Sequence, residues 1–177
     1  MMKKPIDLKN YNMKTIVIIG HMGSGKSLVG KLLSRKINWN YFDSDEEIEK
    51  DLNFSIVDIF KTHGESYFRK KEELIIEKLI KKKYSVISLG GGSITIKKIR
   101  SLLEKKTISI FLKVDIDILA KRLKNSKKRP LLINANIKNK IFLLNKERLP
   151  FYNNANIVVE NSKSIKKTVN DIIKILI

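Results

Sequence analysis

The stretch GHMGSGKS at residues 20–27 matches the pattern G-x-x-x-x-G-K-[ST] of a phosphate-binding loop. It follows the apolar run TIVII at 15–19 and opens an amphipathic stretch from Lys26 to Ile37. Glycines let such a loop curl so that backbone N–H groups face phosphate oxygens, and the following helix N-terminus adds free donors. Chance would supply on the order of 0.01 such matches in this chain. The sequence therefore predicts a nucleotide-binding P-loop between a strand and a helix.

Outward from this loop, short β-branched runs alternate with longer helical patterns, which predicts an α/β fold with a parallel sheet. The continuous apolar run at 15–19 is typical of a strand covered on both faces. Further strands are expected at 41–42, 85–89, 108–112 and 156–159, and further helices at 65–82, 94–103, 115–123, 138–149 and 164–176.

The 177 residues suit one domain, because there is no repeat, no low-complexity linker and no second hydrophobic unit. We expect a single domain over 13–177 and a loose N-terminal arm over 1–12. The polar segment at about 124–139 contains Pro130 and four asparagines and lies between two helical patterns, which makes it a lid candidate.

Composition excludes several classes of protein. The chain has no cysteine, which rules out disulfides and Cys-ligated metals, and no apolar stretch approaches the roughly 20 residues of a membrane span. Without a visible signal peptide, a cytoplasmic protein is expected. The net charge of +19 is almost entirely lysine and is scattered, which favours compositional drift over a polyanion partner. We expect no specific nucleic-acid partner, no membrane partner and a monomer.

The loop also predicts a magnesium site. Lys26 should bridge the β- and γ-phosphates of ATP, and the Ser27 hydroxyl should bind Mg²⁺. Two aspartates could supply a carboxylate. Asp115 follows the run 108–114 but fits the N-cap of a helix better. Asp43 ends the short strand at 41–42, on the same sheet edge as the loop, and is the preferred ligand.

Each of three further clusters, taken by itself, can be explained by a structural role alone. Asp43 or Asp45 could cap a helix, Arg69 and Glu72 could form a surface ion pair, and 90–92 (GGG) could be a turn. In their order along the chain, however, these clusters belong to a specific set of motifs. The set is the P-loop, FDSD at 42–45, FRKKE at 68–72, LGGGS at 89–93, KRPLL at 128–132 and ERLPFY at 147–152. This set resembles the shikimate kinases from about Met13 to the C-terminus.

The resemblance implies a three-layer P-loop NTPase fold with a five-stranded parallel sheet and a lid. It implies transfer of the ATP γ-phosphate to the 3-hydroxyl of shikimate, in aromatic amino-acid biosynthesis. The implied catalytic residues are Asp45, which accepts the hydroxyl proton, Lys26, and the lid residue Arg129. The implied nucleotide contacts are Gly23, Ser24, Gly25, Lys26, Ser27, Leu28, Arg122 near the adenine, and Arg129. The implied substrate contacts are Asp45, Gly91, Arg69 and Arg148 on the carboxylate, and Glu72 behind Arg69.

Residue chemistry agrees with these roles, because the planar fork of arginine matches a carboxylate where lysine does not. Only six of the 37 basic residues are arginine, and four of the six lie at the implied site positions. One departure is the segment 161–164 (NSKS), which lacks the proline often found in the adenine loop of the family.

Three alternatives remain at this stage. The nearest is a sister kinase, such as one for gluconate or a nucleotide, and the two arginines argue against a neutral sugar as the acceptor. A basic nucleic-acid-binding NTPase would need a coherent basic face with interleaved aromatics, and aromatic residues are only 7% of the chain. A P-loop protein without catalysis would bind ATP and show no turnover. Neither His21 nor His63 has a sequence partner that suggests acid–base work.

Overall fold

The computed structural model describes residues 6–8, 14–124, 136–161 and 164–176. Short strands alternate with helices, as the β-branched and amphipathic patterns predict. In chain order the elements are β1 (Thr15–Ile19), α1 (Lys26–Ile37), β2 (Asn40–Asp43), α2 (Ser44–Leu52), α3 (Ile56–Ile80), β3 (Ser85–Ser88), the 3₁₀ helix η1 (Ser93–Thr95), α4 (Lys97–Lys106), β4 (Ile108–Lys113), α5 (Ile116–Leu123), α6 (Ile137–Tyr152), β5 (Ile157–Glu160) and α7 (Ile165–Ile175).

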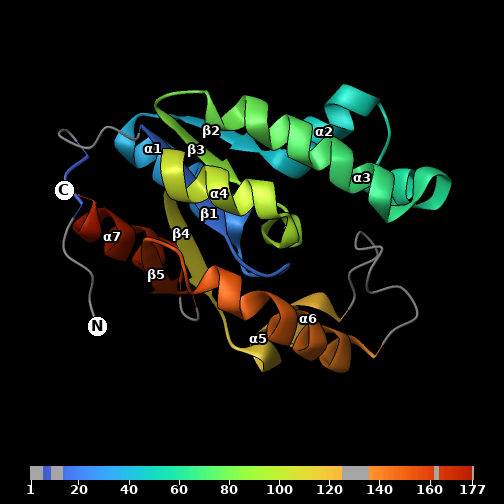
Figure 1. Ribbon diagram of the computed structural model, residues 1–177. Coiled ribbons are helices and arrows are strands. Elements are labelled where there is room, and N and C mark those ends of the chain that lie inside the picture. The colour runs from blue at the N-terminus through green and yellow to red at the C-terminus, as the bar shows by residue number, and fades with distance from the viewer. Residues whose placement is uncertain (1–5, 9–13, 125–135, 162–163, 177) are drawn as a thin grey trace.

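The five strands form one parallel sheet in the order β2-β3-β1-β4-β5 (Figure 1). β1 lies at the centre, where Ile16 pairs with Val86 of β3 on one side and Ile108 of β4 on the other. Because all strands run the same way, the segments that follow β1, β2 and β3 meet at one edge of the sheet. This edge therefore gathers residues 20–27, 43–45 and 90–92, which were expected to form the site.

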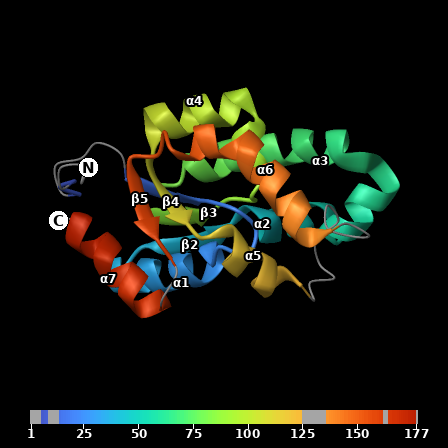
Figure 2. The same ribbon diagram turned by 90° about the horizontal axis from the view of Figure 1, so that it is seen from below.

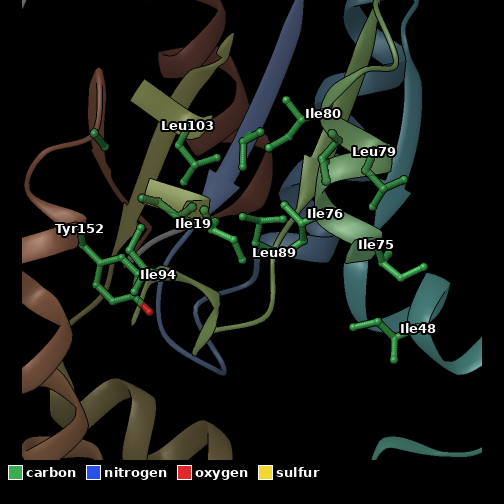
Figure 3. Packing of buried hydrophobic residues seen from close by; sticks show 14 of the residues in the cluster. Ile19, Ile48, Ile75, Ile76, Leu79, Ile80, Leu89, Ile94, Leu103 and Tyr152 are labelled. Atoms are coloured by element: carbon green, nitrogen blue, oxygen red, sulfur yellow. The ribbon is translucent and has the colours of Figure 1, made fainter. Parts of the chain in front are cut away.

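The central strand faces two apolar cores. Val17 and Ile19 join the core under α3 and α4, whereas Ile16 and Ile18 join the core under α1 and α7. In Figure 2, α3, α4 and α6 lie on one side of the sheet and α1 and α7 on the other. Figure 3 shows Ile19 among side chains of the first core, which include Ile76 of α3 and Leu103 of α4. Burial on both faces explains why β1 reads as a continuous apolar run.

The strand predictions are confirmed to within one or two residues, and three helices differ from expectation. The helix expected at 94–103 is α4 (Lys97–Lys106), preceded by the 3₁₀ helix η1 (Ser93–Thr95). α3 begins at Ile56 rather than 65, and Gly64 breaks its helical geometry with φ 77° and ψ 172°. α6 continues through Pro150 to Tyr152, past the predicted end at 149. Proline lacks the N–H that an interior helical residue donates, which made an earlier end the natural expectation.

Part of the predicted N-terminal arm is described. Ile6 forms an isolated parallel bridge with Leu176, its N–H donates to Ile175 O at 2.8 Å, and Leu8 O accepts from Lys14 Nζ at 2.5 Å. Most of the predicted lid, including Arg129, lies outside the described residues. Among the helices that the structure describes, none has the length and apolar character needed to cross a membrane.

Candidate active site

The P-loop closes on itself through its lysine. Gly23 and Gly25 have φ of 76° and 89°, a conformation that glycine adopts without strain, and Gly25 directly precedes α1. Lys26 Nζ donates to the carbonyl oxygens of Gly20 and His21, at 2.9 Å each. The lysine charge is therefore held over the concave side of the loop, where phosphate would lie.

Ser27 and Asp43 meet at the sheet edge, as the sequence predicted for a metal pair. Ser27 Oγ donates to Asp43 Oδ2 at 2.7 Å, and Tyr41 Oη lies 3.1 Å from the same oxygen. The other carboxylate oxygen, Oδ1, accepts the Asp45 N–H at 3.0 Å and caps α2. A hydroxyl and a carboxylate are hard oxygen ligands, which suits Mg²⁺ completed by phosphates and water. Within the described ranges no group of three His, Asp or Glu residues could hold a metal by itself.

Asp115, the alternative metal ligand, caps α5 as expected. Its Oδ1 accepts the Asp117 N–H at 2.8 Å. The run 108–114 is therefore β4 leading into a capped helix, and Asp43 remains the preferred carboxylate.

A pocket lies beside the P-loop and is lined by the predicted substrate contacts. It encloses about 450 Å³ of space, its open mouth included. Its lining combines charged groups with an apolar wall, from the P-loop, α2, α3, the triple-glycine segment and α6. The lining residues are Met22, Asp45, Ile56, Phe60, Phe68, Arg69, Glu72, Gly90, Gly91, Gly92 and Arg148. The pocket therefore suits a small anionic molecule with both an apolar and a polar side.

Arg69 is fixed by carboxylates. Its Nη1 donates to Glu72 Oε2 at 2.6 Å, and its Nε and Nη2 donate to Glu65 Oε1 at 3.2 and 2.9 Å. Glu72 is fully buried and accepts a further bond from Ser93 Oγ at 2.5 Å. Burial disfavours the charged guanidinium, but Glu72 and Glu65 outweigh it and the pKa of Arg69 is raised. The predicted pairing of Arg69 with Glu72 is confirmed, and Ser93 is an addition to it.

Arg148 lies against the triple-glycine segment. It is only 3% exposed, and its Nη1 donates to Gly91 O at 3.1 Å. Tyr152, one turn later on α6, donates its hydroxyl to the same carbonyl oxygen at 2.6 Å. Arg148 lines the pocket, and its Nε is buried with no hydrogen-bond partner among the described residues. A buried, unpartnered cationic donor beside a pocket fits an anionic ligand group.

The glycines at 90–92 leave room for these side chains. A Cβ at Gly90 would lie 2.7 Å from Asp45 Oδ1 and 2.8 Å from Glu72 Oε1, and a Cβ at Gly92 would overlap the Arg69 guanidinium. A Cβ at Gly91 would lie 3.1 Å from the backbone nitrogen of Met22 in the P-loop. The triple glycine is therefore the place where the nucleotide side and the pocket side touch.

The expected adenine side is held by Arg122 and Asn161. Arg122 donates to Gly23 O at 3.1 Å and to Asn161 O at 3.4 Å, which ties α5 to the loop after β5. Asn161 is buried, donates to Ser24 O at 2.6 Å and accepts from Thr168 at 2.7 Å. Asn161 thus joins the P-loop to the segment where the family proline is missing.

Sequence reasoning missed several residues of the site. Ser93 and Tyr152 carried a signal, since Ser93 follows the triple glycine directly and Tyr152 lies four residues after Arg148, on the same helix face. His21, Asn145 and Asn161 carried none, because their contacts join segments more than 120 residues apart, or cap a loop through its backbone.

A family model described as shikimate kinase matches residues 22–177. A shikimate kinase from Buchnera aphidicola subsp. Acyrthosiphon pisum (strain APS) is 40% identical over 167 residues, which cover 92% of this chain and 96% of the relative. The solved structure of shikimate kinase from Acinetobacter baumannii in complex with shikimate is 31% identical, covers 92% of both chains and has a TM-score of 0.89.

A gluconokinase from Sinorhizobium meliloti 1021 is more distant. Its structure is 17% identical, covers 91% of this chain and 90% of its own, and has a TM-score of 0.55. That likeness concerns the fold alone.

Proposed function

The chain belongs to the shikimate kinase family, and on that premise we propose that it transfers the γ-phosphate of ATP to the 3-hydroxyl of shikimate. The products are shikimate 3-phosphate and ADP, in a step of aromatic amino-acid biosynthesis. The observation that carries the proposal is the pocket beside the P-loop, where Arg69, Arg148 and Asp45 line one small space. Two arginine forks suit one carboxylate, and a carboxylate beside them suits a hydroxyl.

On the nucleotide side, the backbone N–H groups of the P-loop and Lys26 would hold the phosphates. The Lys26 ammonium group donates to two carbonyl oxygens of the loop, and these hydrogen bonds would be replaced by bonds to phosphate oxygens when the nucleotide binds. The base and ribose would lie against Arg122 and against the start of α1, where Leu28 is exposed. Arg129 stays a proposed lid contact that lies outside the described residues.

Ser27 and Asp43 would hold Mg²⁺, directly or through water. The bound ion would supply neutralisation of the phosphate charge. Support comes from the 2.7 Å separation of their oxygens, which puts a hydroxyl and a carboxylate at one point of the sheet edge.

On the acceptor side, Arg148 and Arg69 would bind the shikimate carboxylate, with Glu72 and Ser93 fixing Arg69. Gly91 would approach the ring by its backbone. Asp45 would orient the 3-hydroxyl and accept its proton as the oxygen–phosphorus bond forms and the bond to ADP breaks. The positions of both arginines around the triple glycine support this arrangement.

A coupled ADP-release assay tests the function. Purified protein is given Mg²⁺ and ATP with shikimate, gluconate or a nucleoside monophosphate. We expect turnover with shikimate at least a hundredfold faster than with the others, because only shikimate offers both a carboxylate and a ring hydroxyl. Turnover with gluconate instead, or with none of the three, would contradict the proposal. The monomeric state and the cytoplasmic location stay predictions, and sedimentation equilibrium checks the first.

A further inference from the structure

His21 lies inside the P-loop, and its side chain contacts α6. The ring is only 4% exposed. Its Nε2 lies 2.8 Å from Asn145 Oδ1 of α6, and its edge packs on the Tyr152 ring with centroids 5.0 Å apart and planes at 77°. The amide oxygen is an acceptor, so Nε2 carries the hydrogen and His21 is the donor.

The same residue also contacts the catalytic lysine through its backbone. His21 O accepts from Lys26 Nζ at 2.9 Å. On the other side, Asn145 precedes Arg148 by three residues, so both side chains lie on one face of α6. One side-chain hydrogen bond thus joins the residue that anchors Lys26 to the helix turn that carries Arg148.

Other contacts show that this turn of α6 is part of the pocket. Arg148 and Tyr152 both donate to Gly91 O, and Gly91 packs on the Met22 backbone. Apart from these contacts, α6 packs chiefly on α5 and η1. A shift of α6 relative to the P-loop would therefore move Arg148 relative to Lys26, and the His21–Asn145 bond opposes that shift.

The chemistry of the ring fits a donor that stays neutral. Burial lowers the pKa of His21 to about 4, with Arg148 and Lys26 acting in the same direction. A protonated imidazole would add a third cation between the two that bind the ligands. Burying the polar imidazole ring costs free energy that an apolar side chain in the same space would not cost. What histidine adds is the hydrogen bond to Asn145, which an apolar side chain cannot make.

We propose that His21 is a positioning residue that couples the two halves of the active site: its hydrogen bond to Asn145 transmits acceptor binding at Arg148 to nucleotide binding at Lys26. The inference rests on the proposed function. Coupling of this kind is reciprocal, so shikimate tightens nucleotide binding by the same factor as the nucleotide tightens shikimate binding.

The test compares four variants by titration calorimetry with a non-hydrolysable ATP analogue, with and without saturating shikimate. His21→Leu and Asn145→Leu each remove one partner of the hydrogen bond. The double variant removes both partners but loses the same single bond. His21→Gln is the conservative variant, since its amide nitrogen can replace Nε2 as the donor. The matched control is Ser109→Ala, which loses side-chain bonding to Asn156 far from the site (2.8 Å).

We expect the coupling factor to fall about three- to tenfold in His21→Leu and in Asn145→Leu, as for the loss of one hydrogen bond. The double variant should lose no more than either single one, because both remove the same bond. His21→Gln should regain most of the coupling factor. Ser109→Ala should lower the unfolding temperature and leave the coupling factor unchanged. A general loss of structure would not show this pattern of rescue.

Two outcomes overturn the inference while the proposed function stands: wild-type coupling in His21→Leu and Asn145→Leu, or losses that add in the double variant. Shikimate turnover by the wild type is measured on the same preparation. If the wild type shows none, the proposed function fails, and the inference falls with it.

Discussion

At the scale of single residues, arginine is used where several donors of one side chain are needed. Arg69 bonds two carboxylates, and Arg122 bonds two backbone carbonyls. Arg100 bonds the carbonyls of Ile94 and Thr95 at 2.9 and 2.7 Å. A lysine is a point charge and cannot span two acceptors with a planar fork. In a lysine-rich chain, arginine therefore marked both the pocket and, at Arg100, a purely structural position beside it.

Asp45→Asn tests the proposed proton acceptor. We expect kcat with shikimate to fall about 10²- to 10³-fold, because the amide cannot take the proton of the attacking hydroxyl. The KM for ATP should stay within about twofold, since Asp45 lies on the acceptor side. Steady-state kinetics measure both. Asp51→Asn, an exposed carboxylate change on the same helix, is the control and should be silent. Unchanged kcat in Asp45→Asn would remove the residue from the chemistry.

His21 also predicts a pH dependence of stability. Its pKa is lowered from 6.5 to about 4, first by burial. The unfolded chain therefore binds a proton that the folded chain refuses, and the free energy of unfolding falls as pH drops from 6.5 towards 4. Between pH 7.5 and 5 this contribution is about 2 kcal/mol.

Urea unfolding of the wild type, His21→Gln and His63→Gln at both pH values isolates this contribution. His63 is exposed and serves as the control. The pH-dependent loss of stability should be smaller by about 2 kcal/mol in His21→Gln and unchanged in His63→Gln. Equal losses in all three proteins would mean that His21 titrates normally in the folded state.

At the scale of elements, the sequence was sufficient for most strands and helices and insufficient for their long-range contacts. β1 was predictable because burial on both faces leaves a continuous apolar run. The start of α3 was not, because Gly64 interrupts the helical geometry. The end of α6 was not, because a proline in the last turn leaves only one bond unmade. The His21–Asn145 bond spans 124 residues and has no local signature.

Asp43 has two tasks at the start of α2, and two variants separate them. Asparagine caps a helix as well as aspartate does, so Asp43→Asn should keep the thermal midpoint within about 2 °C. Activity at subsaturating Mg²⁺ should still fall at least about tenfold, because the carboxylate charge is lost. Asp43→Ala should lose activity and also about 1 kcal/mol of cap stability. Calorimetry and a Mg²⁺ titration of the rate measure the two effects. Full Mg²⁺ response in Asp43→Asn would exclude Asp43 as a ligand.

At the scale of the whole molecule, the site exists because a parallel sheet brings strand ends together. The P-loop, Asp43 and the triple glycine follow three neighbouring strands, β1, β2 and β3. α6, much later in the chain, closes the pocket through Arg148. The high net charge adds little to this, because in the described residues the lysine of each ion pair is exposed, and exposed pairs contribute about 0–1 kcal/mol.

The N-terminal segment is expected to contribute to the stability of the whole molecule. Ile6 and Leu8 pack against the core under α1 and α7, beside the bridge from Ile6 to Leu176. A chain that begins at Met13 should lose about 1–3 kcal/mol of unfolding free energy, from partial burial of these two side chains. Its kcat and KM values should not change, since this region lies away from the pocket. Full-length Ile6→Ser is the matched variant and should lose a smaller part. An unchanged urea midpoint would support an arm that is loose throughout residues 1–12.

Gly64 divides α3 into two blocks, and both border the pocket. Ile56 and Phe60 come before the break, whereas Arg69 and Glu72 come after it. The break therefore separates Ile56 and Phe60 from the charged lining residues of α3, while Phe68 after the break continues the apolar wall and packs on Phe60 with ring centroids 4.9 Å apart. For inhibitor design, this means that a compound can keep a carboxylate for the proposed arginine side while its apolar substituents are varied against Ile56 and Phe60. For redesign of acceptor choice, a substitution at Phe60 reaches beyond the shape of the pocket, because Phe60 packs on Phe68 and the Arg69 guanidinium lies 5.2 Å from the centroid of the Phe68 ring.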